Sequence, residues 1–310
     1  MRLGSPAAAA LLVLLCSCGD EGLSASERAA LEQLGPLGEP PSSPSNAVAD
    51  DERAVGLGQA LFFDPDLSKA GTGIACVDCH QPKMGWSDDL QFSSGAEGPM
   101  ARHSQTLTNV AYNQFLFWDG RADSLWSQAY AATTKVHEVD QVYLLGHLGE
   151  MADYAQTYTA LFGPMPDPLT ASEDELQEVV INCGKVIEAY ERTLISTNSA
   201  LDRWIAGDEA ALTEQELRGA ALFVGKGGCV ECHGGPNLSD GWFHNIGLPA
   251  ASDGRDASVG LGDLQANANN AAGEWSDDPE WGAAQLAAIA KRVQKAGGAL
   301  VGAHKTPTLR

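Results

Sequence analysis

Two copies of a five-residue pattern, C-x-x-C-H, constrain this chain more than any other feature, and they occupy residues 76–80 and 229–233. In each copy, two thiols three positions apart are followed directly by a histidine, which is the attachment signature of a c-type haem. The thiols would form thioethers to the macrocycle, and the histidine would bind the iron. The residues concerned are Cys76, Cys79, His80, Cys229, Cys232 and His233.

A redox-active disulfide or half of a zinc site is an alternative for either copy alone. Neither alternative explains a histidine at the same offset in both copies. The sequence therefore predicts a protein with two covalently bound c-type haems.

The N-terminal residues 1–18 have the features of an export signal. Arg2 precedes an apolar stretch that is too short to span a bilayer, and two cysteines follow. A lipoprotein signal peptide cleaved before Cys18 fits best, with lipid on Cys18 holding a periplasmic protein at a membrane face. Cys16 is the poorer acceptor because the bulky Leu15 precedes it. Cleavage of an ordinary secretory peptide is the alternative.

The rest of the chain divides by composition and by the haem motifs. Residues 19–49 are rich in Ser, Pro, Gly and Glu, which predicts a flexible tether. The remaining length is enough for two domains of ordinary size. We expect one haem motif in each, with the domains at 50–208 and 209–310.

The charge is strongly acidic. From Cys18 onward, 18 Lys and Arg residues stand against 41 Asp and Glu residues, a net charge near −23. Such a surface excludes nucleic acid as a partner and favours a basic protein partner. An acidic coat that only keeps the protein soluble is the alternative.

The fold is predicted to be mainly α-helical, with long loops. Apolar periodicity predicts a helix over 51–61, and Ser/Thr-x-x-Glu capping boxes predict helices that begin at Ser172 and at Thr213. Cys183 falls on the apolar face of the helix that follows Ser172, which predicts a core residue rather than a reactive thiol. The runs 81–107 and 234–278 lack periodicity and are predicted to be loops.

Each haem motif follows a helix that contains Ala-Leu-Phe, at residues 60–62 and 221–223. This repeated pattern of helix and haem motif favours two cytochrome c-like domains with one haem each.

Several segments together resemble the bacterial dihaem cytochrome c peroxidase/MauG family. Besides the two haem motifs, the resemblance covers residues 58–64, 117–122, 191–194, 219–223, 243–245 and 305–310. It implies a peroxidatic haem in the N-terminal domain and an electron-accepting haem in the C-terminal domain. It also implies a tryptophan between the two haems, and Trp118 lies where that residue belongs.

The resemblance further implies an acid–base pair in the peroxide pocket. Such a group moves a proton between the two peroxide oxygens so that water can leave. Glu138 matches the family's glutamate by spacing, and Gln128, ten residues earlier, matches a glutamine of the same pocket. In the family, an Asn-Pro pair precedes the catalytic glutamate, and different residues stand before Glu138 here. His137 is therefore a second candidate for the acid–base group, and a solvent-exposed Glu138 without a catalytic role is the alternative.

Relatives that need reductive activation block the peroxidatic haem with a distal histidine. Gly95 occupies the approximate position of that histidine, so we expect an open first haem. His103 replaces an Asn that binds calcium between the haems, which argues against the usual calcium site and leaves one bound calcium ion as an open alternative. A role of His103 as a detachable ligand of the haem iron is the alternative.

The family's sequences continue for some fifty residues past the Leu-Arg that ends this chain. That stretch carries the Met or Tyr that is the sixth ligand of the second haem. We therefore expect the sequence to be a fragment. If it is not, His244 or His304 would be the sixth ligand of the second haem.

The sequence and the resemblance together predict an exported dihaem peroxidase. It would reduce hydrogen peroxide with electrons from a small cytochrome c or cupredoxin. A homodimer is compatible with this prediction. A MauG-type enzyme that oxidises a side chain of a partner protein is the nearest alternative. A plain dihaem electron carrier is another, although a carrier needs no acid–base pair.

Overall fold

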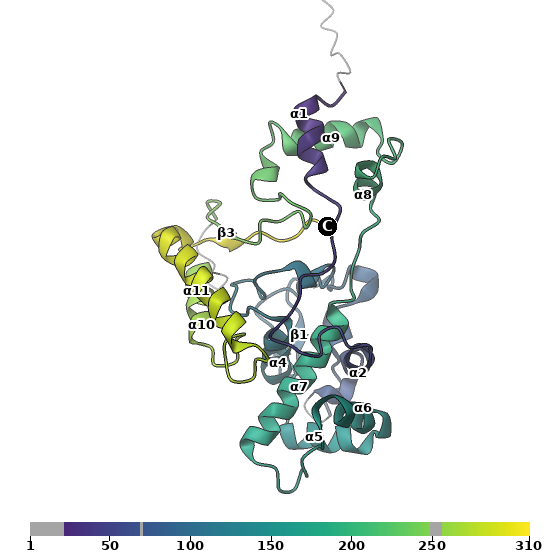
Figure 1. Cartoon of the computed structure of the whole chain (residues 1–310), viewed down its shortest axis with the longest axis vertical. Helices are drawn as coiled ribbons and strands as arrows, with labels where there is room; N and C mark the ends of the chain where they lie inside the picture. Colours follow the sequence, from purple (N-terminus) through teal and green to yellow (C-terminus); the bar gives the residue numbers. More distant parts are fainter. Residues whose placement is uncertain (1–21, 69–70, 249–255) are drawn as a thin grey trace, which may run out of the picture.

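The computed structural model describes residues 22–68, 71–248 and 256–310, so the predicted signal peptide 1–18 and Cys18 lie outside the described residues. No helix within these ranges is long and apolar enough to cross a membrane. The helices are α1 Ala25–Glu32, α2 Glu52–Phe62, α3 Cys76–Cys79, α4 Leu125–Lys135, α5 Gln141–Glu150, α6 Ala152–Phe162, α7 Glu173–Glu191, α8 Ala200–Ile205, α9 Glu214–Val224, α10 Ala257–Ala266 and α11 Pro279–Ala296 (Figure 1). The short strands are β1 Ser94–Gly95, β2 Gly98–Pro99, β3 Phe243–His244 and β4 His304–Lys305, paired as β1–β2 and β3–β4.

The mainly helical fold class is confirmed, and so are the helices predicted from local signals. The side chain of Asp51 caps α2, which ends at Phe62 before Asp64-Pro65. The capping boxes at Ser172 and Thr213 both form, and α7 and α9 start directly after them. Cys183 is buried in α7, as its place on the apolar face predicts.

Helix α7 is the centre of the largest hydrophobic cluster and packs against both α2 and α4. The close crossing with α2 depends on Gly58, because a Cβ atom built there would lie 1.8 Å from the Val186 carbonyl oxygen. Any larger residue at position 58 would push the two helices apart. This packing holds the walls of the functional cavity described below.

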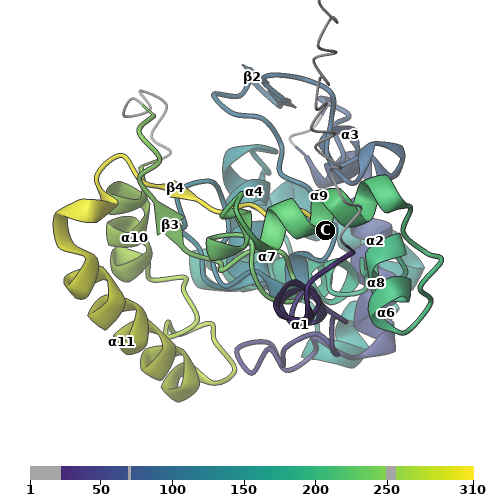
Figure 2. The ribbon, with the colours of Figure 1, turned by 90° about the horizontal axis from the view of Figure 1, so that it is seen from above.

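Two smaller hydrophobic clusters lie outside this helical layer, within the described residues. One joins α1, α8 and α9 around Trp204, next to the second haem motif. The other joins α10 and α11 to Phe115 and Phe243. In Figure 1 the first lies at the top of the molecule and the second at the left, and Figure 2 shows both from above.

The predicted flexible tether over 19–49 is wrong for its described part. Residues 25–32 form α1, which has a complete capping box, packs on α9 and buries Leu31. Further along, the Asn46 amide donates to the Lys185 carbonyl, 2.9 Å away. The prediction relied on the Ser, Pro and Gly content of this segment. That content did not reveal the short helix α1 or the specific polar contacts that hold the residues after it.

The predicted loop over 234–278 is also partly wrong, because it contains β3 and the helix α10. Asp256 caps α10, and Leu261 and Leu264 are buried against α11 and its neighbours. The predicted loop over 81–107 contains only one 3₁₀ turn, Pro82–Met84, and the two-residue strands β1 and β2.

Candidate functional site

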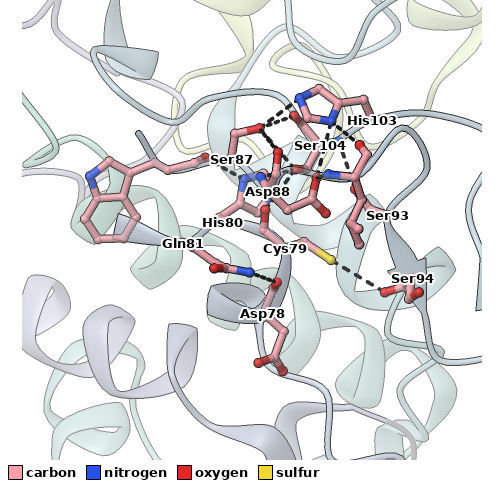
Figure 3. A network of polar contacts seen from close by, with 12 residues as sticks. Asp78, Cys79, His80, Gln81, Ser87, Asp88, Ser93, Ser94, His103 and Ser104 are labelled. Atoms are coloured by element: carbon pink, nitrogen blue, oxygen red, sulfur yellow. Dashed lines mark hydrogen bonds and ion pairs between the residues drawn. The ribbon is translucent and has the colours of Figure 1, made fainter. Parts of the chain in front are cut away.

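The first haem motif forms the one-turn helix α3, and His80 follows it as the C-terminal cap. One helical turn brings Cys76 and Cys79 to the same face. The Nδ1 atom of His80 lies 3.1 Å from the Trp86 carbonyl oxygen, so the ring donates to that oxygen and leaves Nε2 as the available lone pair (Figure 3). Burial lowers the pKa of His80, which favours the neutral imidazole that a metal binds.

The second motif repeats this arrangement on a 3₁₀ turn over Cys229–Glu231. His233 Nδ1 lies 3.1 Å from the Leu238 carbonyl oxygen. Histidines that bind metals commonly donate their other nitrogen to a carbonyl or carboxylate, which fixes the ring. Both motif histidines therefore have the orientation that an iron ligand needs.

A cavity of about 580 Å³ lies against the first motif. Its wall includes Cys76, Cys79 and His80, and most of the remaining lining is apolar. The volume falls within the range of about 300–1,000 Å³ that is usual for cofactor sites. Two thiols, an oriented histidine and an apolar cavity fit a covalently attached haem. The residues of the second motif do not line this cavity.

Besides the first haem motif and His137, the cavity lining contains three further residues singled out from the sequence: Trp118, Gln128 and His103. Trp118 is half-buried and donates its indole N–H to the His103 carbonyl oxygen at 2.9 Å. Gln128 reaches the cavity from α4.

The His103 imidazole is held by oxygen atoms at both nitrogens. Nδ1 lies 2.6 Å from the Leu90 carbonyl oxygen and 3.2 Å from the Asp88 carboxylate, and Nε2 lies 3.0 Å from Ser87 Oγ. Figure 3 shows this network beside His80. His103 would have to break it before either nitrogen could bind an iron.

Glu138 is not among the residues that line the cavity, although His137, directly before it, is. Glu138 is half-buried and has a φ of 50°, in the left-handed region that a residue with a side chain rarely adopts. His137 is buried, with Nδ1 2.6 Å from Ser68 Oγ and Nε2 3.7 Å from Cys76 Sγ. The structure thus places His137, and not Glu138, at the wall beside the first thiol.

Three cationic side chains also line the cavity: Arg102, Arg121 and Lys305. Both arginines form ion pairs with the buried Asp119, at 2.9 and 2.8 Å. Lys305 donates to the Phe115 carbonyl oxygen at 3.1 Å, and burial lowers its pKa to about 8. Each of the three cations therefore already has a partner within the chain.

Glu191, at the end of α7, is a cavity residue that the sequence analysis did not single out. Its side chain is buried, and burial together with the nearby Glu188 raises its pKa to about 8. A signal was present in the sequence, because Glu191 lies four residues after Ile187 on the apolar face of the helix.

Comparison with known proteins gives this site a family context. Residues 52–210, half of the chain, match the family described as di-haem cytochrome c peroxidase. The match contains the first haem motif, α2, α4 and α7, and therefore most of the cavity wall.

Individual relatives agree with the family match. The chain is 38% identical to the methylamine utilization protein MauG of Methylophilus methylotrophus, over 66% of this chain and 58% of that protein. It is 38% identical to the cytochrome-c peroxidase IdrP1 of Denitromonas iodatirespirans, over 71% and 56%. It is 31% identical to the cytochrome c551 peroxidase of Nitrosomonas europaea, over 73% and 65%. The chain therefore spans a little over half the length of the first two of these relatives.

Solved structures share the fold at lower identity. A MauG-like protein associated with microbial copper homeostasis superposes with a TM-score of 0.61 at 24% identity, covering 88% of this chain and 74% of the other. The diheme peroxidase BthA of Burkholderia thailandensis gives a TM-score of 0.61 at 22% identity, covering 87% and 68%.

Proposed function

Because the chain belongs to the di-haem cytochrome c peroxidase and MauG family, we propose that it reduces hydrogen peroxide to water with two electrons taken from a small cytochrome c or cupredoxin. The observation that carries the proposal is the shared geometry of His80 and His233. Each holds its Nδ1 on a backbone carbonyl, which leaves Nε2 as the available lone pair, and each directly follows a pair of cysteines. The cavity at the first motif provides room for a haem and a small substrate.

A haem bound at the first motif would supply the iron that peroxide meets, and a haem at the second motif would collect electrons from the donor. We assign 50–208 as the peroxidatic domain and 209–310 as the electron-accepting domain. Trp118 lines the first cavity and belongs to the Phe-Trp-Asp-Gly-Arg segment. In this proposal its indole carries electrons between the two haem sites.

Proton transfer to peroxide is assigned to Glu138, with Gln128 holding the substrate by hydrogen bonds. Glu138 keeps this role although it lies outside the cavity lining, because both nitrogens of His137 are already engaged by Ser68 and Cys76. The left-handed backbone at Glu138 costs about 1–3 kcal/mol, and such strain is concentrated at functional positions.

Two rival functions use the same framework. A MauG-type enzyme would oxidise a side chain of a partner protein, and the relatives include proteins of that name. A plain electron carrier would need neither Gln128 nor an acid–base group. We favour the peroxidase because Gln128 lies in the cavity wall.

The proposal extends to the protein's place in the cell. We propose an exported, periplasmic protein anchored by lipid at Cys18, without a calcium ion of the family's usual kind because His103 stands in place of the Asn ligand. Association as a homodimer fits the same proposal.

The proposed function is tested by mixing the haem-loaded protein with peroxide and a reduced, basic cytochrome c. We expect two molecules of cytochrome to be oxidised for each peroxide. The net charge of −22 should attract this donor, and charge attraction is screened within about 8–10 Å at physiological salt. The second-order rate should therefore fall steeply as ionic strength rises from about 10 to about 300 mM.

An acidic cytochrome of similar potential serves as the control and should react slowly at every ionic strength. Oxidation of a partner protein's side chain without turnover of the cytochrome would identify the MauG-type alternative. A rate that does not change with salt would show that the acidic surface only keeps the protein soluble.

The first haem is expected to be high-spin and reactive in the oxidised protein. Gly95 is buried in the β1–β2 hairpin, where a Cβ atom would lie 2.9 Å from Met100 Sδ and 3.0 Å from the Val136 carbonyl oxygen. Met100 and Val136 both line the cavity. Gly95→His should therefore bring an imidazole to the first haem, and the oxidised electronic spectrum should become low-spin.

Gly95→Ala is the matched control, because it adds the same Cβ atom without an imidazole, and it should stay high-spin. A wild-type protein with both irons low-spin would contradict the open site. His103→Ala would then show whether His103 leaves its network to block the iron.

A further inference from the structure

One buried acid in the cavity wall has no role in the function proposed above. Glu191 has 4% of its surface exposed, and within the described part of the chain its Oε2 atom has no hydrogen-bond partner. Glu188, one turn earlier on α7, is equally buried but accepts a hydrogen bond from the Trp126 backbone N–H at 3.0 Å. An orphaned carboxyl oxygen in a cofactor cavity is costly, so it calls for a functional explanation.

The surroundings of Glu191 leave its charge uncompensated. Arg192, the next residue, is directed elsewhere, because it pairs with Asp50 at 2.8 Å and donates to the Pro41 carbonyl oxygen at 2.8 Å. On α2, which packs along α7, Glu52 and Arg53 are exposed, and Arg53 pairs with Asp51.

The cations of the cavity wall are occupied as well. Arg102 and Arg121 pair with Asp119, and Lys305 donates to the Phe115 carbonyl oxygen.

Glu191 lies close to the point where the first haem would be attached. Its negative charge is the second cause, after burial, that raises the pKa of the Cys76 thiol. His137 approaches the same sulfur atom from the end of α4, at 3.7 Å. A carboxyl group here would sense the charge of a haem bound through Cys76, because charges interact strongly in a cavity shielded from water.

We propose that Glu191 is a proton-binding site coupled to the oxidation state of the first haem. With a haem attached at the first motif, the Glu191 carboxylate would take one proton from solvent for each electron gained at the iron, so the net charge of the cavity would stay the same. On reoxidation Glu191 would return that proton to solvent. This inference rests on the proposed attachment of a haem at Cys76, Cys79 and His80. The pKa of Glu191, raised to about 8, places the exchange within the working range of an enzyme.

The test is a redox titration of the first haem at several pH values between about 6 and 10. For a one-electron couple, each tenfold change in proton concentration that is fully linked to reduction shifts the potential by about 59 mV. We expect the wild-type potential to fall as pH rises near 8, and we expect Glu191→Gln to lose that part of the dependence. Glu188→Gln is the matched control: it removes the neighbouring carboxyl that contributes to the raised pKa of Glu191, so the pH dependence should persist but move to lower pH.

A second measurement covers the case in which Glu191→Gln fails to load haem. The infrared difference spectrum of the wild-type protein, recorded on reduction of the first haem, should contain a carboxylic-acid C=O band that shifts in D₂O. Absence of that band, or an unchanged pH dependence in Glu191→Gln, would overturn the inference. Failure of the wild-type protein to bind haem at the first motif would instead overturn the proposed function.

Discussion

Covalent haem at both motifs is expected to survive denaturation, and loss of one motif should remove one haem only. Protein matured with a c-type attachment system should have the mass of the chain plus two haems. Cys76→Ala and Cys229→Ala should each lose stable attachment at their own site, because each removes one of two thioether bonds. Mass spectrometry of the denatured protein measures this directly.

Cys183→Ala is the control for this experiment. Its thiol is buried on α7, away from both motifs in the sequence, and burial raises its pKa to about 12. Both haems should remain in this variant. A wild-type protein that carries one haem or none would contradict the assignment of the motifs, and a bound zinc ion would support the alternative weighed from the sequence.

Replacement of Glu138 by glutamine should lower peroxide turnover by about a hundredfold or more, the usual effect of losing a general acid–base group. The substitution keeps the size of the side chain and removes its negative charge and its ability to exchange a proton. Haem content and the oxidised spectrum should be unchanged, and the loss should appear in the rate of reaction with peroxide in stopped-flow measurements.

His137→Gln separates the two acid–base candidates. In the structure His137 contacts Ser68 and Cys76, so we expect this variant to disturb the attachment side of the cavity while peroxide turnover changes less than in Glu138→Gln. The opposite ranking would transfer the catalytic role to His137, which lines the cavity where Glu138 does not.

Local signals in the sequence predicted local structure well. A capping box is a pattern of four consecutive residues that marks the start of a helix. The helix starts at Ser172 and Thr213 could therefore be predicted from the sequence. The orientation of His80 depends on a carbonyl only six residues away, but no pattern identifies that carbonyl in advance. The haem motifs were recognisable because their chemistry requires adjacent residues.

The cavity could not be predicted in the same way, because it is assembled from distant parts of the chain. Its wall combines Phe62, Gln128, Glu191 and Thr308, which no periodicity relates to one another. The α1 helix was missed because eight residues between Ser- and Pro-rich stretches give a weak apolar period. Glu191 was overlooked because it was considered only as part of the segment 191–194 that resembles the family. Its place on the apolar face of a helix already indicated a buried carboxyl group.

The polar contacts of the N-terminal segment determine when this protein can finish folding. Arg310 donates to the Leu34 carbonyl oxygen at 2.7 Å across 276 positions, and α1 packs on α9 nearly two hundred residues further along the chain. A ribosome makes the chain from its N-terminus, so residues 22–34 emerge well before the residues that they contact in the folded protein. Meanwhile Leu31 and Leu34, both buried in the finished fold, are exposed to solvent and to other chains. Residues 22–34 therefore stay exposed to aggregation and to chaperones until distant parts of the chain have been made.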